Sequence, residues 1–324
     1  MEQNNFVICA DNNVTYSMGI LMYSILKNTK GTCIFHIFFN GELNSKDEER
    51  LQLLSQSFSC QIIIYWIDNS DIRELHGTNE ITATAFYRLI APYILYEEGV
   101  DTCLYLDTDI LCVRDVSPLF FLDFKDKVAY VVQSSTSYPE EMKQYCKSIG
   151  MHDNKFFNSG VLLINTKLYS VNDIGKKAIQ LKLNKADTRY VDQGVLNIAL
   201  EGNVLYDLNS NNNCTMSVQN FEFHQNKVRF IHFTGTKKPW KLYTACWGAG
   251  YTEKGRYSWK FQYYKAWRDY RDASPWKDIP FEIPKNATEW RYLAKMYYLP
   301  QKQYIKGIQA YIKYLQCKYM SLQE

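Results

Sequence analysis

The sequence predicts an α/β protein with a mixed central sheet, helices on both faces of that sheet, and a C-terminal helical region. The first observation is that short strand-like runs alternate with longer helical stretches through the first third of the chain. This alternation is typical of strands joined by crossover helices, which form a largely parallel sheet. The second is composition: 46% hydrophobic and 22% charged residues over 324 positions suit one large globular domain with an appendage.

The expected elements follow in order along the chain. The first strands are residues 6–9, 33–39, 61–67 and 102–106. The helices between them are residues 17–27, 45–57 and 84–96. Three later apolar runs, residues 128–133, 161–165 and 228–233, should join the same sheet and make it mixed. The polar run at residues 209–213 is interpreted as a loop.

The character of the sequence changes after about residue 251, which predicts a domain of residues 1–252 and a helical region of residues 253–324. Residues 254–324 hold fourteen Lys or Arg against six Asp or Glu, together with many Tyr and Trp. Four prolines, Pro275, Pro280, Pro284 and Pro300, should divide this region into short helices. Such a composition suits the headgroup layer of an anionic membrane. A structural cap on the first domain is the alternative, and nucleic-acid binding is not expected because no binding motif is present.

Cysteine usage and hydropathy indicate a cytoplasmic protein. The nine cysteines are odd in number and contain no C-x-x-C pair, so we expect buried free thiols rather than disulfides or a zinc site. No run approaches the roughly 18 apolar residues of a transmembrane helix. The first residues also lack the basic and apolar regions of a signal peptide.

The segment LYLDTDILCVRD, residues 104–115, places an Asp-Thr-Asp motif directly after a buried strand. Residues two apart in an extended strand point to the same side, so Asp107 and Asp109, with Thr108 between them, can aim two carboxylates at one point. Two such carboxylates suit Mg²⁺ or Mn²⁺, which could hold a diphosphate. A lone D-x-D motif is weak, and a solvated turn after a strand is the alternative.

Four other places in the sequence complete a pattern with this motif. They are residues 6–26 (FVICADNNVTYSMGILMYSIL), 82–95 (TATAFYRLIAPYIL), 155–165 (KFFNSGVLLIN), and 190–197 (YVDQGVLN) combined with 228–240 (VRFIHFTGTKKPW). Over roughly its first 250 residues, the chain resembles bacterial retaining glycosyltransferases of family 8, the group of the lipopolysaccharide galactosyl- and glucosyltransferases. The resemblance implies a GT-A glycosyltransferase fold with a Rossmann-like sheet, a UDP-sugar donor and a divalent metal.

The resemblance places the nucleotide at the end of the first strand. It implies that Asp11 and Asn13, beside Ala10, contact the uridine, where ligands of open α/β sheets bind. This chain has Val14 where the family usually has a Tyr that stacks on uracil. Capping of the following helix by Asp or Asn is the alternative. The resemblance also implies that Arg88, on the helix expected at residues 84–96, meets the donor near its diphosphate; an exposed Arg paired with an acid is the alternative.

Further matches imply the sugar site. Asn158 and Ser159 lie in an expected loop before the strand at 161–165, and the family's matching residues hold the donor hexose. Gly160 lets backbone approach closely. Asp192 and Gln193 match a pair beside the anomeric carbon. A plain turn before a strand is the alternative for the loop.

The last matches imply the metal and diphosphate sites. His232 matches the family's third metal ligand, with Asp107 and Asp109, and an imidazole ligand favours Mn²⁺ over Mg²⁺. A lone structural histidine is the alternative. Gly235 and Lys238 follow in a loop, where backbone amides and an ammonium can hold the diphosphate.

These inferences predict a retaining α-glycosyltransferase that moves glucose or galactose from a UDP-sugar to a sugar hydroxyl of a lipopolysaccharide core. Gln193 is a neutral amide and a poor nucleophile, so we favour front-face attack by the acceptor hydroxyl, with Asp192 orienting the donor; double displacement stays open. The enzyme should act peripherally on the inner face of the cytoplasmic membrane. A D-x-D phosphohydrolase and a non-catalytic carbohydrate- or membrane-binding protein are the alternative functions.

Overall fold

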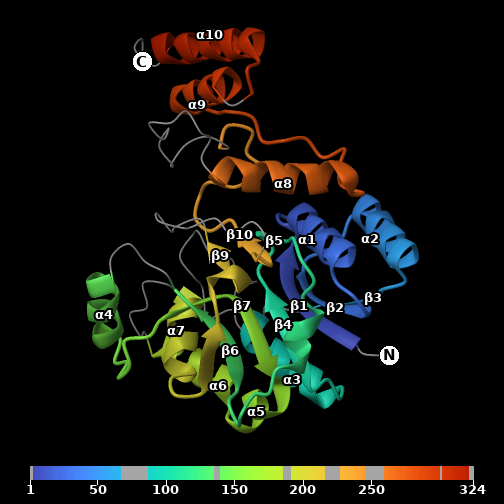
Figure 1. Ribbon diagram of the computed structural model, residues 1–324, viewed down its shortest axis with the longest axis vertical. Coiled ribbons are helices and arrows are strands. Elements are labelled where there is room, and N and C mark those ends of the chain that lie inside the picture. The colour runs from blue at the N-terminus through green and yellow to red at the C-terminus, as the bar shows by residue number, and fades with distance from the viewer. Residues whose placement is uncertain are drawn as a thin grey trace. The chain divides into compact units, whose positions relative to one another are not determined.

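The protein is described by a computed structural model (Figure 1) that covers residues 3–66, 87–134, 139–184, 191–215, 227–244, 259–299 and 301–320. The chain forms two compact units. The first comprises Met1–Val218 and His224–His232, and the second comprises Gln219–Phe223 and Phe233–Glu324. Each unit is described by itself.

The first unit contains a seven-stranded sheet with the order β3-β2-β1-β4-β7-β6-β8. Its strands are β1 (Gln3–Asp11), β2 (Thr32–Asn40), β3 (Gln61–Trp66), β4 (Thr102–Leu106), β6 (Ala129–Gln133), β7 (Phe157–Asn165) and β8 (Val204–Leu208). β1 pairs in parallel with β2 and β4, whereas β7 runs antiparallel to β4 and β6. The predicted mixed sheet is therefore confirmed.

Helices cover both faces of this sheet (Figure 1). The helices of this unit are α1 (Thr15–Asn28), α2 (Ser45–Phe58), α3 (Ala91–Glu97), α4 (Pro139–Ser148), α5 (Thr166–Val171), α6 (Ile174–Leu183) and α7 (Val191–Ala199), with 3₁₀ turns η3 (Ser117–Phe121) and η4 (Ser210–Asn212). Leu95, Tyr169 and Leu196 bring α3, α5 and α7 into one buried core with Tyr105 and Leu162 of the sheet. This core fixes β4 and β7, the two central strands that carry site residues.

Three local predictions were wrong. The helix expected at residues 84–96 has its first three residues outside the described part of the chain; within that part it begins at Ala91 and not at residue 87, because Pro92 lies in its first turn and favours a helix start there. Arg88 therefore lies in the 3₁₀ turn before α3 and not on a helix. The strand expected from residue 161 begins at Phe157, so Asn158, Ser159 and Gly160 belong to β7 and not to a loop.

The third correction concerns residues 228–233, which do not join the central sheet. They form β10 (Phe230–His232), which pairs with β5 (Ile110–Cys112) and β9 (Cys214–Thr215) in a separate three-stranded sheet. β4 ends at Leu106, and β5 begins at Ile110 after a turn. The Asp-Thr-Asp motif therefore connects strands of two different sheets and is not the extended strand end that the motif suggested.

The second unit contains the C-terminal helices α8 (Trp259–Ala273), α9 (Ala287–Tyr298) and α10 (Tyr304–Met320). Trp267 and Trp276 are fully buried in it. α9 and α10 pack closely, because a Cβ added at Gly307 would lie 2.4 Å from the ring of Tyr298. The predicted C-terminal helices are confirmed.

Two predictions about the whole chain can be compared with the described residues. Eight of the cysteines lie in that part; all eight are free thiols, and all but Cys317 are buried. None of the helices there combines the length and the apolar character that a bilayer crossing requires.

Candidate active site

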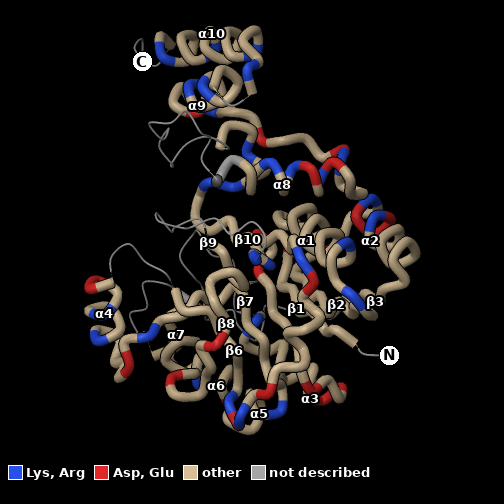
Figure 2. The backbone as a smooth tube through the Cα atoms, in the orientation of Figure 1, with Lys and Arg blue, Asp and Glu red and all other residues tan. Residues whose placement is uncertain are grey.

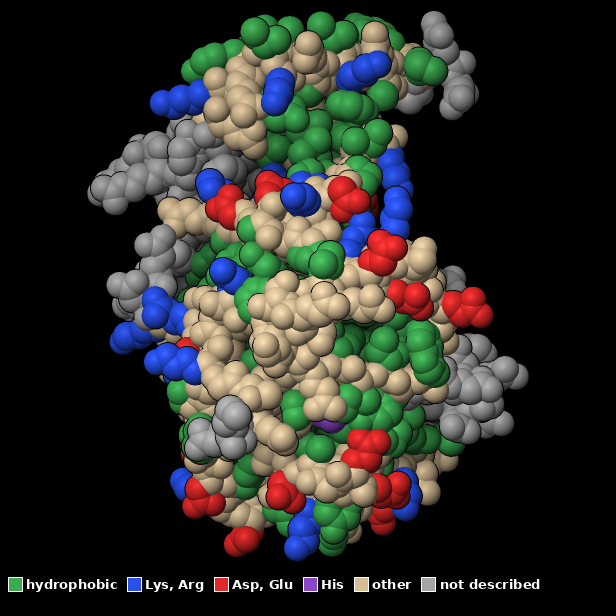
Figure 3. Space-filling model, turned by 90° about the vertical axis from the view of Figure 1, so that its right-hand side faces the viewer, with side chains coloured by type: hydrophobic (Ala, Val, Ile, Leu, Met, Phe, Trp, Pro, Cys, Tyr) green, Lys and Arg blue, Asp and Glu red, His purple; other side chains and the backbone are tan. Residues whose placement is uncertain are grey.

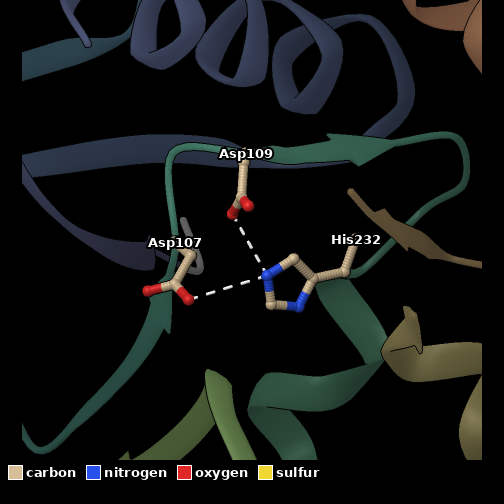
Figure 4. Close-up of side chains that lie close together, drawn as sticks. All are labelled: Asp107, Asp109 and His232. Carbon is tan, nitrogen blue, oxygen red and sulfur yellow. Dashed lines mark ion pairs between the residues drawn. The ribbon is translucent and has the colours of Figure 1, made fainter. Parts of the chain in front are cut away.

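The two aspartates of the motif and His232 converge on one point from two directions (Figure 4). His232, at the end of β10, places Nε2 3.1 Å from Asp109 Oδ1 and 3.6 Å from Asp107 Oδ2. One ligand atom from each residue lies within 4.8 Å of the others. Two carboxylate oxygens and one imidazole nitrogen form a donor set that suits a divalent transition metal.

The His232 ring is held by a residue that the sequence did not nominate. Its Nδ1 lies 2.9 Å from Asn213 Oδ1, in a fully buried contact. Because an amide oxygen can only accept, this contact favours the tautomer with hydrogen on Nδ1 and a lone pair on Nε2. His232 is 2% exposed, so its neighbours and not solvent decide its orientation. Asn213 therefore holds the His232 ring with Nε2 facing the two aspartates.

Gly160 leaves the space that this cluster occupies. A Cβ built at Gly160 would lie 2.3 Å from His232 Cε1 and 2.6 Å from Asp107 Oδ2. Its carbonyl oxygen accepts a 2.9 Å hydrogen bond from Asp107 N. The absence of a side chain at this position of β7 is thus a condition for the ligand geometry.

Arg88 connects the cluster to the start of α7. Its Nη2 lies 3.0 Å from Asp107 Oδ1, and its Nε lies 3.0 Å from Asp192 Oδ2. Its Nη1 donates to Ser159 Oγ at 2.9 Å. Tyr105 OH also donates to Asp107 Oδ1 at 2.8 Å. Since Oδ1 of Asp107 is occupied, Oδ2 faces His232.

Burial shapes the charges of this network. Arg88 is 8% exposed, so the alternative of an exposed Arg paired with one acid does not hold. Burial opposes its charge, but Asp107 and Asp192 outweigh it and raise the pKa of Arg88. Burial raises the pKa of Asp192, while Arg88 opposes that rise. The 3.0 Å ion-pair geometry supports the ionised carboxylate, because neutral Asp192 would leave a buried guanidinium with less compensation.

Gln193 belongs to a second group of polar contacts. Its Oε1 accepts from Asn158 Nδ2 at 3.0 Å and from Ser159 N at 3.2 Å. Asn158 Oδ1 in turn accepts from Asn213 Nδ2 at 2.8 Å. Asn158, Ser159 and Gln193, which the sequence nominated from distant segments, are therefore in direct contact, and Asn213 joins them to His232.

At the end of β1, the residues that the sequence nominated for the uridine do not cap the helix that follows. The N-cap of α1 is Val14, with no side-chain capping bond. Asp11 is buried and its Oδ1 accepts from Asn13 N at 2.9 Å, whereas the side chain of Asn13 is exposed. Ala10 is buried, and Asp11 pairs in register with Asn40 of β2. Neither Asp11 nor Asn13 serves as the cap of this helix.

Gly235 and Lys238 lie in the second unit. Gly235 adopts φ +79°, a conformation that favours glycine, and is exposed. Lys238 Nζ donates to the Phe233 carbonyl at 2.9 Å and lies 5.8 Å from the Trp240 ring centroid. Lys238 is thus anchored within its own loop.

Sequence reasoning missed Asn213 and Tyr105. Asn213 ends the polar run at residues 209–213, which was interpreted only as a loop. A polar residue directly before buried β9 was the available signal, because buried amides require partners. The apolar neighbours of Tyr105 predict a core residue, and nothing in the sequence indicates that its hydroxyl contacts Asp107.

The fold and the cluster define a class of protein: a GT-A glycosyltransferase. The galactosyltransferase LgtC, solved in complex with donor and acceptor sugar analogs, matches with a TM-score of 0.66 over 85% of this chain and 97% of that one, at 22% identity. The bifunctional glycosyltransferase WbbM matches with a TM-score of 0.65 over 85% of this chain and 50% of that one, at 18% identity. These likenesses support the fold.

Family models identify the group within that class. Residues 5–244 match glycosyl transferase family 8, and residues 262–318 match the family 8 C-terminal region. The chain therefore belongs to glycosyl transferase family 8. It is 30% identical to the lipopolysaccharide glucosyltransferase WaaO of Escherichia coli K12, over 94% of this chain and 88% of that protein. It is 28% identical to the lipopolysaccharide 1,3-galactosyltransferase of Salmonella typhimurium LT2, over 97% and 91% of the two chains.

Proposed function

We propose that this glycosyltransferase moves glucose or galactose from a UDP-sugar to a sugar hydroxyl of a lipopolysaccharide core, with retention of the α configuration. The observation that carries the proposal is the convergence of Asp107, Asp109 and His232 beside the Arg88–Asp192 ion pair in a family 8 chain. The names of two relatives that match almost the whole chain support the acceptor class.

The residues present fit a bound divalent ion. Arg88 engages Asp107 Oδ1 and Asn213 engages His232 Nδ1, so Asp107 Oδ2 and His232 Nε2 can face an ion. Gly160 leaves room beside both residues. We favour Mn²⁺, with Mg²⁺ as the second candidate, because imidazole is a softer ligand than oxygen. When bound, the ion would neutralise the charge that develops on the departing UDP. Asp107, Asp109 and His232 would hold it.

The contacts of Gln193 and Asp192 support front-face attack. Gln193 Oε1 already accepts two hydrogen bonds, and Asp192 is buried against Arg88. Neither group is available as a nucleophile without breaking these contacts. The acceptor hydroxyl would attack from the side that UDP leaves, and a phosphate oxygen of UDP would take its proton. Asp192 would act as a positioning residue by holding Arg88.

The remaining nominated residues would bind the donor. Asp11 and Asn13, beside Ala10, would contact the uridine. Arg88, Gly235 and Lys238 would contact the diphosphate, while Asn158 and Ser159 would contact the hexose. Thr108 would place its backbone between the two metal-binding aspartates.

The proposal is tested by UDP release from UDP-glucose and UDP-galactose, with Mn²⁺, with Mg²⁺, and with chelator. We expect slow hydrolysis that requires the ion and accelerates when a lipopolysaccharide core acceptor is added. Turnover of simple phosphoesters without UDP-sugar hydrolysis would instead indicate a phosphohydrolase. Tight UDP binding without metal-dependent UDP release would indicate a non-catalytic protein.

A second part of the proposal concerns location. We propose that α10 docks peripherally on the anionic inner face of the cytoplasmic membrane. Its exposed apolar side chains are Tyr304, Ile305, Ile308, Tyr311, Ile312, Tyr319 and Met320. Hydrophobic side chains gather on the surface of α9 and α10, at the top of Figure 3.

Basic residues accompany this apolar surface. Lys302, Lys306 and Lys313 are exposed beside or along α10, and Lys and Arg recur along α8, α9 and α10 (Figure 2). Exposed apolar side chains flanked by ammonium groups suit the interface of a bilayer with anionic headgroups. A structural cap would be expected to bury these side chains, yet Ile305 is 75% exposed.

A further inference from the structure

A cavity in the first unit, apart from the Asp107–Asp109–His232 cluster, is lined by cationic side chains. It has a volume of about 600 Å³ and lies between the segment after β5, the η4 turn and the residues before β10. Arg114, Lys227 and Arg229 line it, together with the amides of Asn209 and Asn211. This volume falls in the range of roughly 300–1,000 Å³ that small-molecule sites occupy.

Among the lining residues that the structure describes, Asp115 alone carries a carboxylate, and this carboxylate is already engaged. Asp115 Oδ1 accepts from Ser117 Oγ at 2.8 Å, from Ser117 N at 3.0 Å and from Lys30 N at 3.2 Å. These bonds hold the loop after β5. Asp115 therefore offsets only part of the charge of Arg114, Lys227 and Arg229, and the lining keeps a net positive charge.

Arg229 is held in place for a ligand. Its Nε donates to the Asp115 carbonyl at 3.2 Å, and its Nη1 donates to Asn212 Oδ1 at 3.0 Å. Its Nη2 and the Lys227 ammonium have no protein partner within the part of the chain that the structure describes. A guanidinium fixed by two bonds presents its remaining donors with little loss of side-chain entropy.

The cavity and the metal cluster occupy opposite ends of the same two strands. β10 runs from Phe230 to His232, so Arg229 precedes it and His232 ends it. In the antiparallel register, His232 pairs with Ile110 and Phe230 pairs with Cys112. Arg229 and His232 are three residue steps apart along the strand, or roughly 10 Å. The cavity is therefore distinct from the cluster, and the same two strands, β5 and β10, run from one to the other.

The polar run at residues 209–213 makes a second connection. Asn212 accepts from Arg229 at the cavity, and its neighbour Asn213 contacts His232 at the cluster. Asn209 organises the turn by accepting from Asn211 N at 3.0 Å. The polar run at residues 209–213 thus contacts both the cavity, through Arg229, and the cluster, through His232.

We infer that this cavity binds the phosphate or carboxylate group of an anionic sugar ligand. Arginine and lysine donors match the oxygens of such a group, and the asparagine amides can bind sugar hydroxyls. The inference goes beyond the proposed transfer reaction, which requires neither Lys227 nor Arg114. The group could belong to a charged acceptor glycan or to a free phosphorylated sugar, and the chemistry of recognition is the same.

The test measures binding of glucose 6-phosphate, inorganic phosphate and glucose to the metal-free full chain by isothermal titration. The test variant is the double substitution Arg114→Gln with Lys227→Gln, which leaves the structural bonds of Arg229 in place. The matched control is Lys143→Gln, an exposed lysine on α4 that pairs with Glu140. Thermal unfolding establishes that all three proteins are folded.

We expect glucose 6-phosphate to bind the wild type and the control alike, and the double variant at least about tenfold more weakly, the change that loss of a charge-assisted hydrogen bond produces. Binding should also weaken with added salt. Equal affinity for the double variant, or equal binding of glucose, would overturn the inference. If inorganic phosphate binds as tightly as glucose 6-phosphate and loses the same affinity in the double variant, the cavity binds anions but does not recognise the sugar, and the sugar part of the inference is overturned.

A kinetic comparison separates the two sources of the anion. If the charged group belongs to the acceptor, the double variant should show a raised KM for a phosphorylated acceptor while UDP-sugar hydrolysis stays at the wild-type rate. If the source is a free phosphosugar, the KM stays unchanged and the titration still shows the loss. Absence of UDP-sugar hydrolysis in the wild type would overturn the proposed function but not this site, because the titration does not depend on catalysis.

Discussion

The active-site network of the first unit and helix α10 of the second unit differ in which groups they bury: charged side chains are buried in the first, and apolar side chains are exposed on the second. The first unit buries Arg88, Asp192 and His232 and gives each a partner within hydrogen-bond or ion-pair distance. The second unit leaves Ile305 and Ile312 of α10 exposed among lysines. Buried charges are costly unless a network compensates them, whereas exposed apolar surface is costly unless a partner covers it. The first arrangement suits chemistry, and the second suits docking.

The largest expected effect comes from removing a metal-binding carboxylate. Asp109→Ala should reduce transfer by about 100-fold or more, the scale of losing one electrostatic stabiliser of the transition state. Asp109 is preferred to Asp107, because Asp107 also compensates Arg88. The measurement is UDP release at saturating Mn²⁺.

The matched control is Asp101→Ala, an exposed carboxylate just before β4. It should retain wild-type activity. Near-normal, Mn²⁺-dependent activity of Asp109→Ala would remove this residue from the ligand set.

The second-largest effect should come from Asn213, a residue that the sequence did not nominate. Asn213→Ala should weaken metal affinity by about 10- to 100-fold, the typical cost of losing the partner that orients a ligating histidine. Asn213→Asp keeps an oxygen acceptor for His232 Nδ1 but loses the donor to Asn158 Oδ1, so it should restore only part of that affinity. Metal titration of both variants tests this, and equal affinity in Asn213→Ala and wild type would reduce Asn213 to a packing residue.

Replacing Gln193 should lower turnover more than it lowers the affinity for UDP. Gln193→Ala removes the acceptor of Asn158 and Ser159, so it should depress turnover by about 10-fold or more, since these two donors lose their partner in the proposed sugar site. UDP affinity should change less, and the exposed Gln180→Ala should change neither. Equal losses of turnover and UDP binding would move Gln193 away from the reaction centre, and a trapped glycosyl adduct on Gln193 or Asp192 would establish double displacement.

The smallest effect on chemistry should come from the lysines beside and along α10. Lys302, Lys306 and Lys313 changed together to Glu should release the protein from anionic vesicles while UDP-sugar hydrolysis persists. Each basic residue near such a surface contributes about 1 kcal/mol to binding. Vesicle sedimentation at two salt concentrations measures the release.

The control for that variant has the same net charge but leaves α10 unchanged. It replaces the exposed Lys265, Lys277 and Lys285 with Glu. If both variants remain bound, or if the wild type ignores anionic vesicles, α10 does not dock on membranes.

The sequence predicted every strand of the central sheet except β8, because a buried strand leaves a local pattern of apolar residues. Apart from the two aspartates of the motif, the nominated residues that meet around His232 came from the resemblance to family 8 and not from a local pattern. β4 has the predicted bounds, since a buried strand next to a polar turn is a local signal. The separate sheet of β5, β9 and β10 could not be predicted, because it joins short segments that are far apart in the chain. The role of Asn213 was hidden for the same reason: its partners, Asn158 and His232, lie 55 and 19 positions away.

Mn²⁺ binding measured directly by electron paramagnetic resonance tests the central claim, that Asp107, Asp109 and His232 form the metal site of this glycosyltransferase. The titration compares wild type with His232→Ala, each with and without UDP. We predict that wild type binds one Mn²⁺ more tightly when UDP is present, and that His232→Ala loses most of this affinity while its fold, followed by thermal unfolding, is retained. Unchanged Mn²⁺ affinity in folded His232→Ala would contradict the account.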